Sequence, residues 1–164
     1  MIASRARLEL ARAHVRSAAL ARAAAQIAPA LAHADAEGAL PLECYLELAR
    51  TDAALSAGDV TKASEIVRSV EAVVRSPENL DLHLRLLATR ARVIAGAGPK
   101  AYAIKTLRAL SEKAHERGLL PLALEIDLAL RDIATTAGHP EIAAEASARI
   151  EETRAATGIV LANL

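Results

Sequence analysis

The side chains best suited to acid–base or metal chemistry are five histidines and a single cysteine, Cys44. The segment HADAE at 33–37 places a histidine and a glutamate one helical turn apart, a spacing that metal sites can use. The segment SEKAHERG at 111–118 also combines a histidine, His115, with two glutamates, Glu112 and Glu116. Both segments are more typical of a solvated helix end, and no phosphate-binding loop, HExxH or nucleophile motif accompanies them. We therefore expect no catalytic residue, metal or cofactor.

Charge is balanced over the whole chain, with 20 lysines and arginines against 20 aspartates and glutamates. A net charge of zero argues against a dedicated nucleic-acid binder. The distribution is uneven, because residues 1–30 carry five arginines and one glutamate, whereas residues 111–164 carry five basic and nine acidic residues. This layout could steer an encounter with a partner, or it could be a solvated surface with a chance asymmetry.

The elements that would position these residues are predicted to be helices. Apolar residues make up 53% of the chain, yet phenylalanine and tryptophan are absent and the aromatic residues are Tyr45 and Tyr102. A core of alanine, leucine, isoleucine and valine suits close helix packing better than a sheet, in which β-branched and aromatic residues are favoured. We therefore predict an all-α fold.

A repeating pattern runs through the chain and divides it into four units. Alanine–glycine pairs recur at a constant spacing, at 57–58, 97–98 and 137–138. The spacing is 40 residues, and a period of this length is typical of a helical array. The predicted units are residues 1–40, 41–80, 81–120 and 121–160. One alanine column is present in all four units: Ala23, Ala63, Ala103 and Ala143.

Each unit is predicted to contain two helices joined by a tight turn. In the second unit these helices span roughly residues 42–56 and 60–75. Gly58 stands where the first helix must end, because glycine tolerates the left-handed backbone of helix ends. Asp59 can accept a hydrogen bond from a free N–H of the next helix and so cap it. The small Ala63 then allows the two helices to cross closely.

The pattern Gly58-Asp59-x-x-x-Ala63 resembles the inter-helix turn of the tetratricopeptide repeat family, and the later units keep the same glycine-to-alanine spacing. The unit is longer than the usual repeat of that family. In this respect it is similar to the tetratricopeptide-like arrays of bacterial transcription activators of the maltose-regulator type and of multidomain bacterial kinases and regulators. This resemblance implies an α-solenoid of about four antiparallel helical hairpins in a right-handed superhelix. It also implies that the first helices line a concave groove for a protein or peptide.

Candidate binding residues lie on one stripe of the predicted first helices, at the repeat positions that the resemblance places on the concave side. Stacking of units would bring Arg5, Tyr45 and Arg85 into one row, and arginine and tyrosine are enriched at binding hot spots. Either the stripe is a ligand groove, or its charges pair with one another and hold the stack together. The candidates are Arg5, Arg12, Tyr45, Asp52, Arg85, Arg92, Glu125 and Asp132.

The expected function is a non-catalytic scaffold for protein–protein interaction, acting as a regulatory or assembly module in the cytoplasm. No apolar run approaches the roughly 18 residues of a membrane span. The alternatives are a helical-repeat module that binds nucleic acid through its arginines, a self-associating oligomerisation domain, and an enzyme built on a groove carboxylate–histidine pair. Residues 158–164 resemble the opening of a fifth unit, so we expect a fragment of a larger protein and a possible homodimer through uncapped ends.

Overall fold

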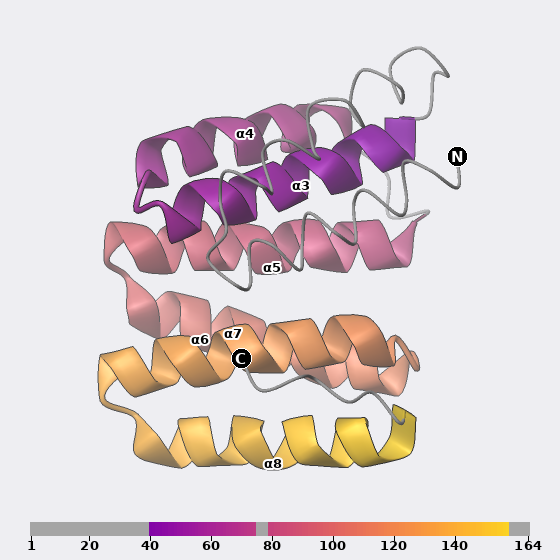
Figure 1. The fold of residues 1–164 in the computed structure, drawn as a ribbon, viewed down its shortest axis with the longest axis vertical. Helices are drawn as coiled ribbons and strands as arrows, with labels where there is room; N and C mark the ends of the chain where they lie inside the picture. The colour runs from indigo at the N-terminus through magenta and orange to yellow at the C-terminus, as the bar shows by residue number, and fades with distance from the viewer. Residues whose placement is uncertain (1–39, 75–78, 158–164) are drawn as a thin grey trace. The chain divides into compact units, whose positions relative to one another are not determined.

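The structure is a computed structural model that describes residues 40–74 and 79–157, and these residues form helices and no strands (Figure 1). The predicted all-α class is therefore confirmed for this part of the chain. The candidates Arg5 and Arg12 and the predicted fifth unit at 158–164 lie outside the described residues. No helix among the described residues is long and apolar enough to cross a membrane. The helices are α3 (Leu40–Ser56), α4 (Val60–Val73), α5 (Leu80–Ala97), α6 (Lys100–Glu116), α7 (Leu120–Ala137) and α8 (Pro140–Thr157).

Helix boundaries recur with the period that the sequence predicts. The first helices α3, α5 and α7 begin at Leu40, Leu80 and Leu120. The second helices α4, α6 and α8 begin at equivalent positions of the repeat, at Val60, Lys100 and Pro140. The predicted helix at 42–56 corresponds to α3, and the helix predicted at 60–75 corresponds to α4, which ends at Val73. Glycine, proline and aspartate residues at the helix ends therefore set the boundaries of these helices.

The turns between paired helices use the residues that the sequence singles out. Gly58 and Gly138 have φ angles of 77°, in the left-handed region that side chains with a Cβ rarely adopt. Asp59 caps α4, because its Oδ1 accepts a hydrogen bond of 3.0 Å from the backbone N–H of Lys62. Pro140 opens α8, where a proline costs no helical hydrogen bond.

The described residues fall into two compact units, of which one ends at Thr89 and the other begins at Arg90, both within α5. In the first unit α3 and α4 form an antiparallel hairpin and lie side by side (Figure 1). The alanine predicted at their crossing, Ala63, is fully buried, as is Leu46 of α3. Cys44 is also buried, at 5% exposure.

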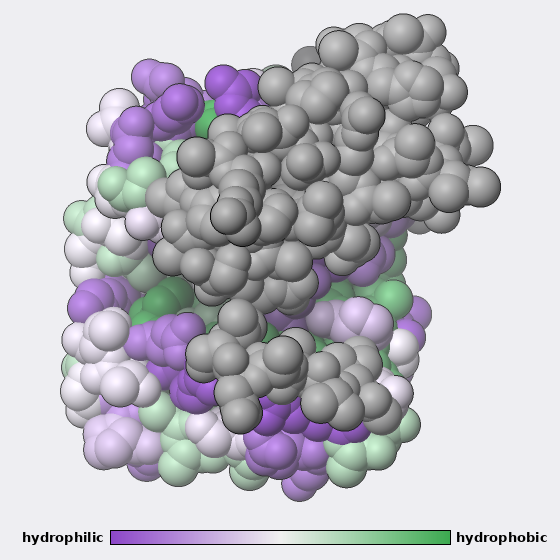
Figure 2. Space-filling model, viewed as in Figure 1, coloured by the Kyte–Doolittle hydropathy of each residue, from purple (hydrophilic) through white to green (hydrophobic). Residues whose placement is uncertain are grey.

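In the second unit α7 packs against both α6 and α8. Its buried face is apolar apart from one charged residue, and Leu130 of α7 and Leu107 of α6 are fully buried. Ala103 is fully buried like its counterpart in α4, whereas Ala143 of α8 remains partly exposed. Helix α8 buries few large side chains, and its surface at the lower edge of Figure 2 mixes hydrophilic with weakly hydrophobic residues.

Candidate binding site

One pair of predicted binding residues is in direct contact in the first unit. Tyr45 of α3 and Arg85 of α5 occupy the same position of consecutive repeats. The guanidinium carbon of Arg85 lies 5.8 Å from the centre of the Tyr45 ring, which is within the range of a cation–π interaction. The structure therefore brings these two candidate residues together.

Asp81 joins this pair, and we refer to Tyr45, Asp81 and Arg85 as the Tyr45 cluster. The Tyr45 hydroxyl donates a hydrogen bond of 2.6 Å to Oδ2 of Asp81. The same carboxylate oxygen lies 3.7 Å from Nε of Arg85. Asp81 stands in the first turn of α5, where a negative charge interacts favourably with the helix dipole. The three side chains thus form a closed polar arrangement.

Asn79 fixes the start of α5 next to the Tyr45 cluster. Its Oδ1 accepts a hydrogen bond of 3.1 Å from the backbone N–H of Leu82, which satisfies one of the free donors at the helix end. The same oxygen lies 3.5 Å from the Tyr45 hydroxyl. The capping residue Asn79 and the first turn of α5 therefore position the two acceptors near the Tyr45 hydroxyl.

The environment of Tyr45 keeps its phenol protonated. Burial is the main reason that the pKa of Tyr45 rises to about 12, and the hydrogen bond to Asp81 and the charge of that carboxylate add to the effect. Arg85 and Asn79 act in the opposite direction, and their effects are smaller. Over the whole physiological pH range the hydroxyl is therefore a hydrogen-bond donor.

The remaining described candidates, Asp52, Arg92, Glu125 and Asp132, do not belong to the Tyr45 cluster. Asp52, Arg92 and Glu125 are partly exposed, and each of them interacts with other groups of the fold. Asp132 is more exposed and forms an ion pair of 2.8 Å with its neighbour Arg131. The partners of Asp132 and of the Tyr45 hydroxyl, Arg131 and Asp81, both lie outside the predicted stripe.

A buried polar network in the second unit is the feature that the sequence reading misses. Asp127 of α7 is fully buried and accepts a hydrogen bond of 2.6 Å from Oγ of Ser111. One of its oxygens lies 3.0 Å from Nε2 of His115, and the other lies 3.1 Å from Nε of Arg149. Ser111 and His115 belong to α6 and Arg149 belongs to α8, so one carboxylate joins three helices.

The network continues to the surface through a second carboxylate. Glu145 accepts a hydrogen bond of 2.8 Å from Nη1 of Arg149 on its own helix. It also lies 2.9 Å from Nη2 of Arg108, which links α8 to α6. We refer to Arg108, Ser111, His115, Asp127, Glu145 and Arg149 together as the Asp127 network.

The interpretation of residues 111–118 as a solvated helix end is wrong for His115, because its side chain is 27% exposed and lies 3.0 Å from the buried Asp127 carboxylate. The sequence contains a signal for this burial. Asp127 falls four residues after Ala123 and three before Leu130, so it lies on the apolar stripe of its helix. A charged residue on such a stripe predicts a partner from a neighbouring helix.

The Asp127 carboxylate and the Cys44 thiol are both buried. The carboxylate of Asp127 is occupied by three side chains. The pKa of the Cys44 thiol is raised by burial and, to a smaller degree, by the charge of Glu43, so the reactive thiolate is disfavoured. Within residues 40–74 and 79–157, no group of three or more His, Cys, Asp or Glu residues could hold a metal ion.

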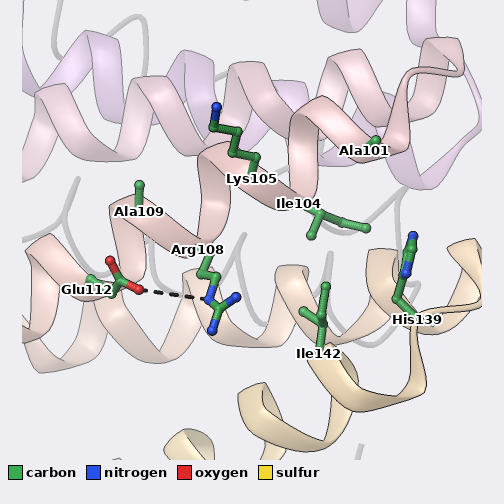
Figure 3. Close-up of a pocket in the computed structure, with 8 residues that line it drawn as sticks. All are labelled: Ala101, Ile104, Lys105, Arg108, Ala109, Glu112, His139 and Ile142. Atoms are coloured by element: carbon green, nitrogen blue, oxygen red, sulfur yellow. Dashed lines mark ion pairs between the residues drawn. The ribbon is translucent and has the colours of Figure 1, made fainter.

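An open depression lies on the surface of the second unit between α6 and α8 (Figure 3). Its volume is about 560 Å³, and its lining combines apolar and charged side chains. Arg108 reaches from α6 toward α8, and Ile142 points from α8 toward α6. The lining residues are Ala101, Ile104, Lys105, Arg108, Ala109, Glu112, His139 and Ile142.

Comparison with known protein families, curated proteins and solved structures gives no match to this chain.

Proposed function

We propose that the chain is a non-catalytic helical-repeat module that binds a segment of another protein on the face carrying the Tyr45 cluster. In this proposal the helical hairpins form a right-handed α-solenoid of the tetratricopeptide-like kind, within a bacterial regulatory protein of the cytoplasm. The observation that carries it is the contact between Tyr45 and Arg85, which stand at the same position of successive first helices.

The chemistry of the Tyr45 cluster suits recognition of a peptide. Tyrosine and arginine are over-represented among residues that dominate binding energy, because both combine a broad apolar surface with hydrogen-bond donors. Asp81 holds the tyrosine hydroxyl at 2.6 Å, so the ring is ordered before any partner arrives. Preorganisation of this kind lowers the entropy that binding must overcome.

The repeat pattern supports a scaffold rather than an enzyme. The first helices start at Leu40, Leu80 and Leu120, so equivalent residues recur on each of them. Repeated helices of this kind create extended binding surfaces. The single buried thiol, Cys44, fits a reducing compartment.

The test compares partner recovery by the wild-type chain and by a double variant, Arg85→Glu with Arg92→Glu. A charge-matched control, Lys62→Glu with Arg68→Glu, changes two exposed residues of α4 instead. Each protein is immobilised, and the recovered partners are quantified by mass spectrometry. Circular dichroism and a thermal melt establish that each variant retains its helices.

We expect the first double variant to lose the partners that the wild-type chain and the control both retain. Tyr45→Phe, which keeps the ring and removes the bond to Asp81, should weaken the same partners to a smaller degree. Identical recovery by all four proteins would show that the Tyr45 cluster is not the binding site.

A further inference from the structure

Tyr102 is an exposed aromatic side chain on α6, far along the chain from the Tyr45 cluster. It is one of two aromatic residues in the whole sequence, and 54% of its surface is accessible. Tyr102, Lys105 and Ala109 stand three and seven residues apart, so they share one stripe of the helix. Lys105 and Ala109 line the depression between α6 and α8. Tyr102 therefore shares a stripe of α6 with two residues that line the depression.

Apolar side chains from both helices line the depression. Ile104 of α6 and Ile142 of α8 face it, and small side chains at Ala101 and Ala109 leave room above the helix (Figure 3). Small residues on an exposed helical stripe allow another helix to approach closely, because no long side chain separates the two backbones. The depression is open along α6 rather than enclosed, which suits a row of side chains better than a small molecule.

The basic residues that line the depression differ in whether they already form ion pairs. Arg108 already pairs with Glu145 at 2.9 Å and with Glu112 at 3.9 Å. Lys105 is exposed, and no hydrogen bond or ion pair of its side chain occurs in the part of the chain that the structure describes. An unpaired ammonium next to apolar surface favours a carboxylate on the ligand.

We propose that the surface formed by Tyr102, Lys105, Ala109 and Ile142, the Tyr102 surface, docks an acidic amphipathic helix of another protein. Apolar residues of that helix, one turn apart, would cover Ile142 and the ring of Tyr102, and a carboxylate between them would pair with Lys105. Recognition of an amphipathic helix through anchors at positions i, i+3 and i+7 is a common binding mode. This surface is distinct from the Tyr45 cluster and does not depend on its function.

The test selects ligands from a displayed library of random peptides about 15 residues long, the length at which an isolated helix becomes marginally stable. Enriched peptides are labelled, and their affinities for the wild-type chain are measured by fluorescence anisotropy. Lys105→Glu and Tyr102→Ala alter the proposed surface, and Lys62→Glu is the charge-matched control on α4. Lys105 and Tyr102 are exposed, so these changes leave the core intact, which thermal melts verify.

The expected result is enrichment of peptides with acidic and apolar residues at helical spacing. Their affinity should fall about tenfold or more in Lys105→Glu and in Tyr102→Ala and stay unchanged in the control. Absence of enrichment, or enrichment of peptides without acidic residues, would overturn the proposal. Equal affinity for all variants would do the same.

Further measurements exclude other occupants of the Tyr102 surface and locate the peptide site. Tighter binding of anionic vesicles or single-stranded RNA than of the peptides, lost in Lys105→Glu, would assign the surface to a membrane or nucleic acid and overturn the proposal. A concentration-dependent dimer in sedimentation velocity that Tyr102→Ala abolishes would assign it to a second copy and overturn it too. Peptide binding that Arg85→Glu removes and Lys105→Glu leaves intact would move the site to the Tyr45 cluster, which overturns this proposal and leaves the proposed function standing.

Discussion

At Tyr45, burial and the Asp81 carboxylate both favour the neutral phenol, so pH should affect the folded and unfolded chains differently. The folded pKa is about 12, whereas an unfolded tyrosine titrates near pH 10. Because the folded value is the higher one, the stabilisation is fully present below about pH 10 and is lost as the pH rises toward 12. We expect the free energy of unfolding to fall over this window.

The measurement uses Tyr102→Phe, which leaves Tyr45 as the single tyrosine of the chain. Tyrosinate absorbance of this variant should appear about two pH units later in the folded state than in urea. Coincident titration curves in the two states would contradict the closed arrangement of Tyr45 and Asp81.

Two aspartates of α7 should differ sharply in their effect on stability. Asp127 is fully buried among Ser111, His115 and Arg149, whereas Asp132 is exposed and paired with its neighbour in sequence. Without Asp127, the buried Ser111 hydroxyl loses its acceptor and Arg149 keeps, among the described residues, only Glu145 as a partner. Removing one partner of a buried ion pair costs about 3–5 kcal/mol. We therefore expect Asp127→Ala to lower the free energy of unfolding by about this amount.

The matched control is Asp132→Ala, for which the expected loss is at most about 1 kcal/mol because the pair is solvated. Urea unfolding followed by circular dichroism measures both values. Similar losses for the two variants would mean that Asp127 does not join the three helices as its contacts indicate.

Whether a contact can be predicted from the sequence depends on how far apart in the chain its residues lie. The cap at Asp59 could be predicted, because it depends on a hydrogen bond within one helical turn. The contact between Tyr45 and Arg85 could also be predicted, since equivalent positions of stacked repeats become neighbours. The position of Asp127 on the apolar stripe signals burial, but its partners Ser111 and Arg149 follow from the packing of three helices, which no local pattern contains.

At the scale of the helices, the alanine column distinguishes crossings that are tight from those that are open. Ala63 in α4 is fully buried, whereas Ala143 at the same repeat position of α8 is partly exposed. We expect Ala63→Leu to overpack the crossing of α3 and α4 and to cost about 1–3 kcal/mol. Ala143→Leu should cost clearly less, because the added side chain can turn toward solvent.

Thermal melts of the two alanine variants provide the comparison. A melting temperature of Ala63→Leu equal to that of the wild-type chain would refute the tight crossing. The same pair also explains why the sequence period predicts helices better than it predicts burial. All four units repeat the alanine, but a residue is buried only where a neighbouring helix covers it.

At the scale of the whole molecule, charge decides between binding of a protein and binding of nucleic acid. The chain has no net charge, although the segment 1–30 is basic and the segment 111–164 is acidic. A protein that neutralises several phosphates loses affinity steeply as salt rises, because bound counterions are released. The Asp127 network and the Tyr45 cluster pair several of the arginines with carboxylates, which leaves fewer of them to contact phosphate.

We therefore expect weak binding of single-stranded RNA at low salt and no detectable binding at physiological salt. Anisotropy of a labelled oligonucleotide, titrated at several salt concentrations, measures both the affinity and its salt dependence. Tight binding with a slope of several released ions would favour the nucleic-acid alternative. In that outcome, Arg85→Glu with Arg92→Glu should reduce the slope if these arginines contact phosphate, and Lys62→Glu with Arg68→Glu should reduce it if the contacts lie on α4.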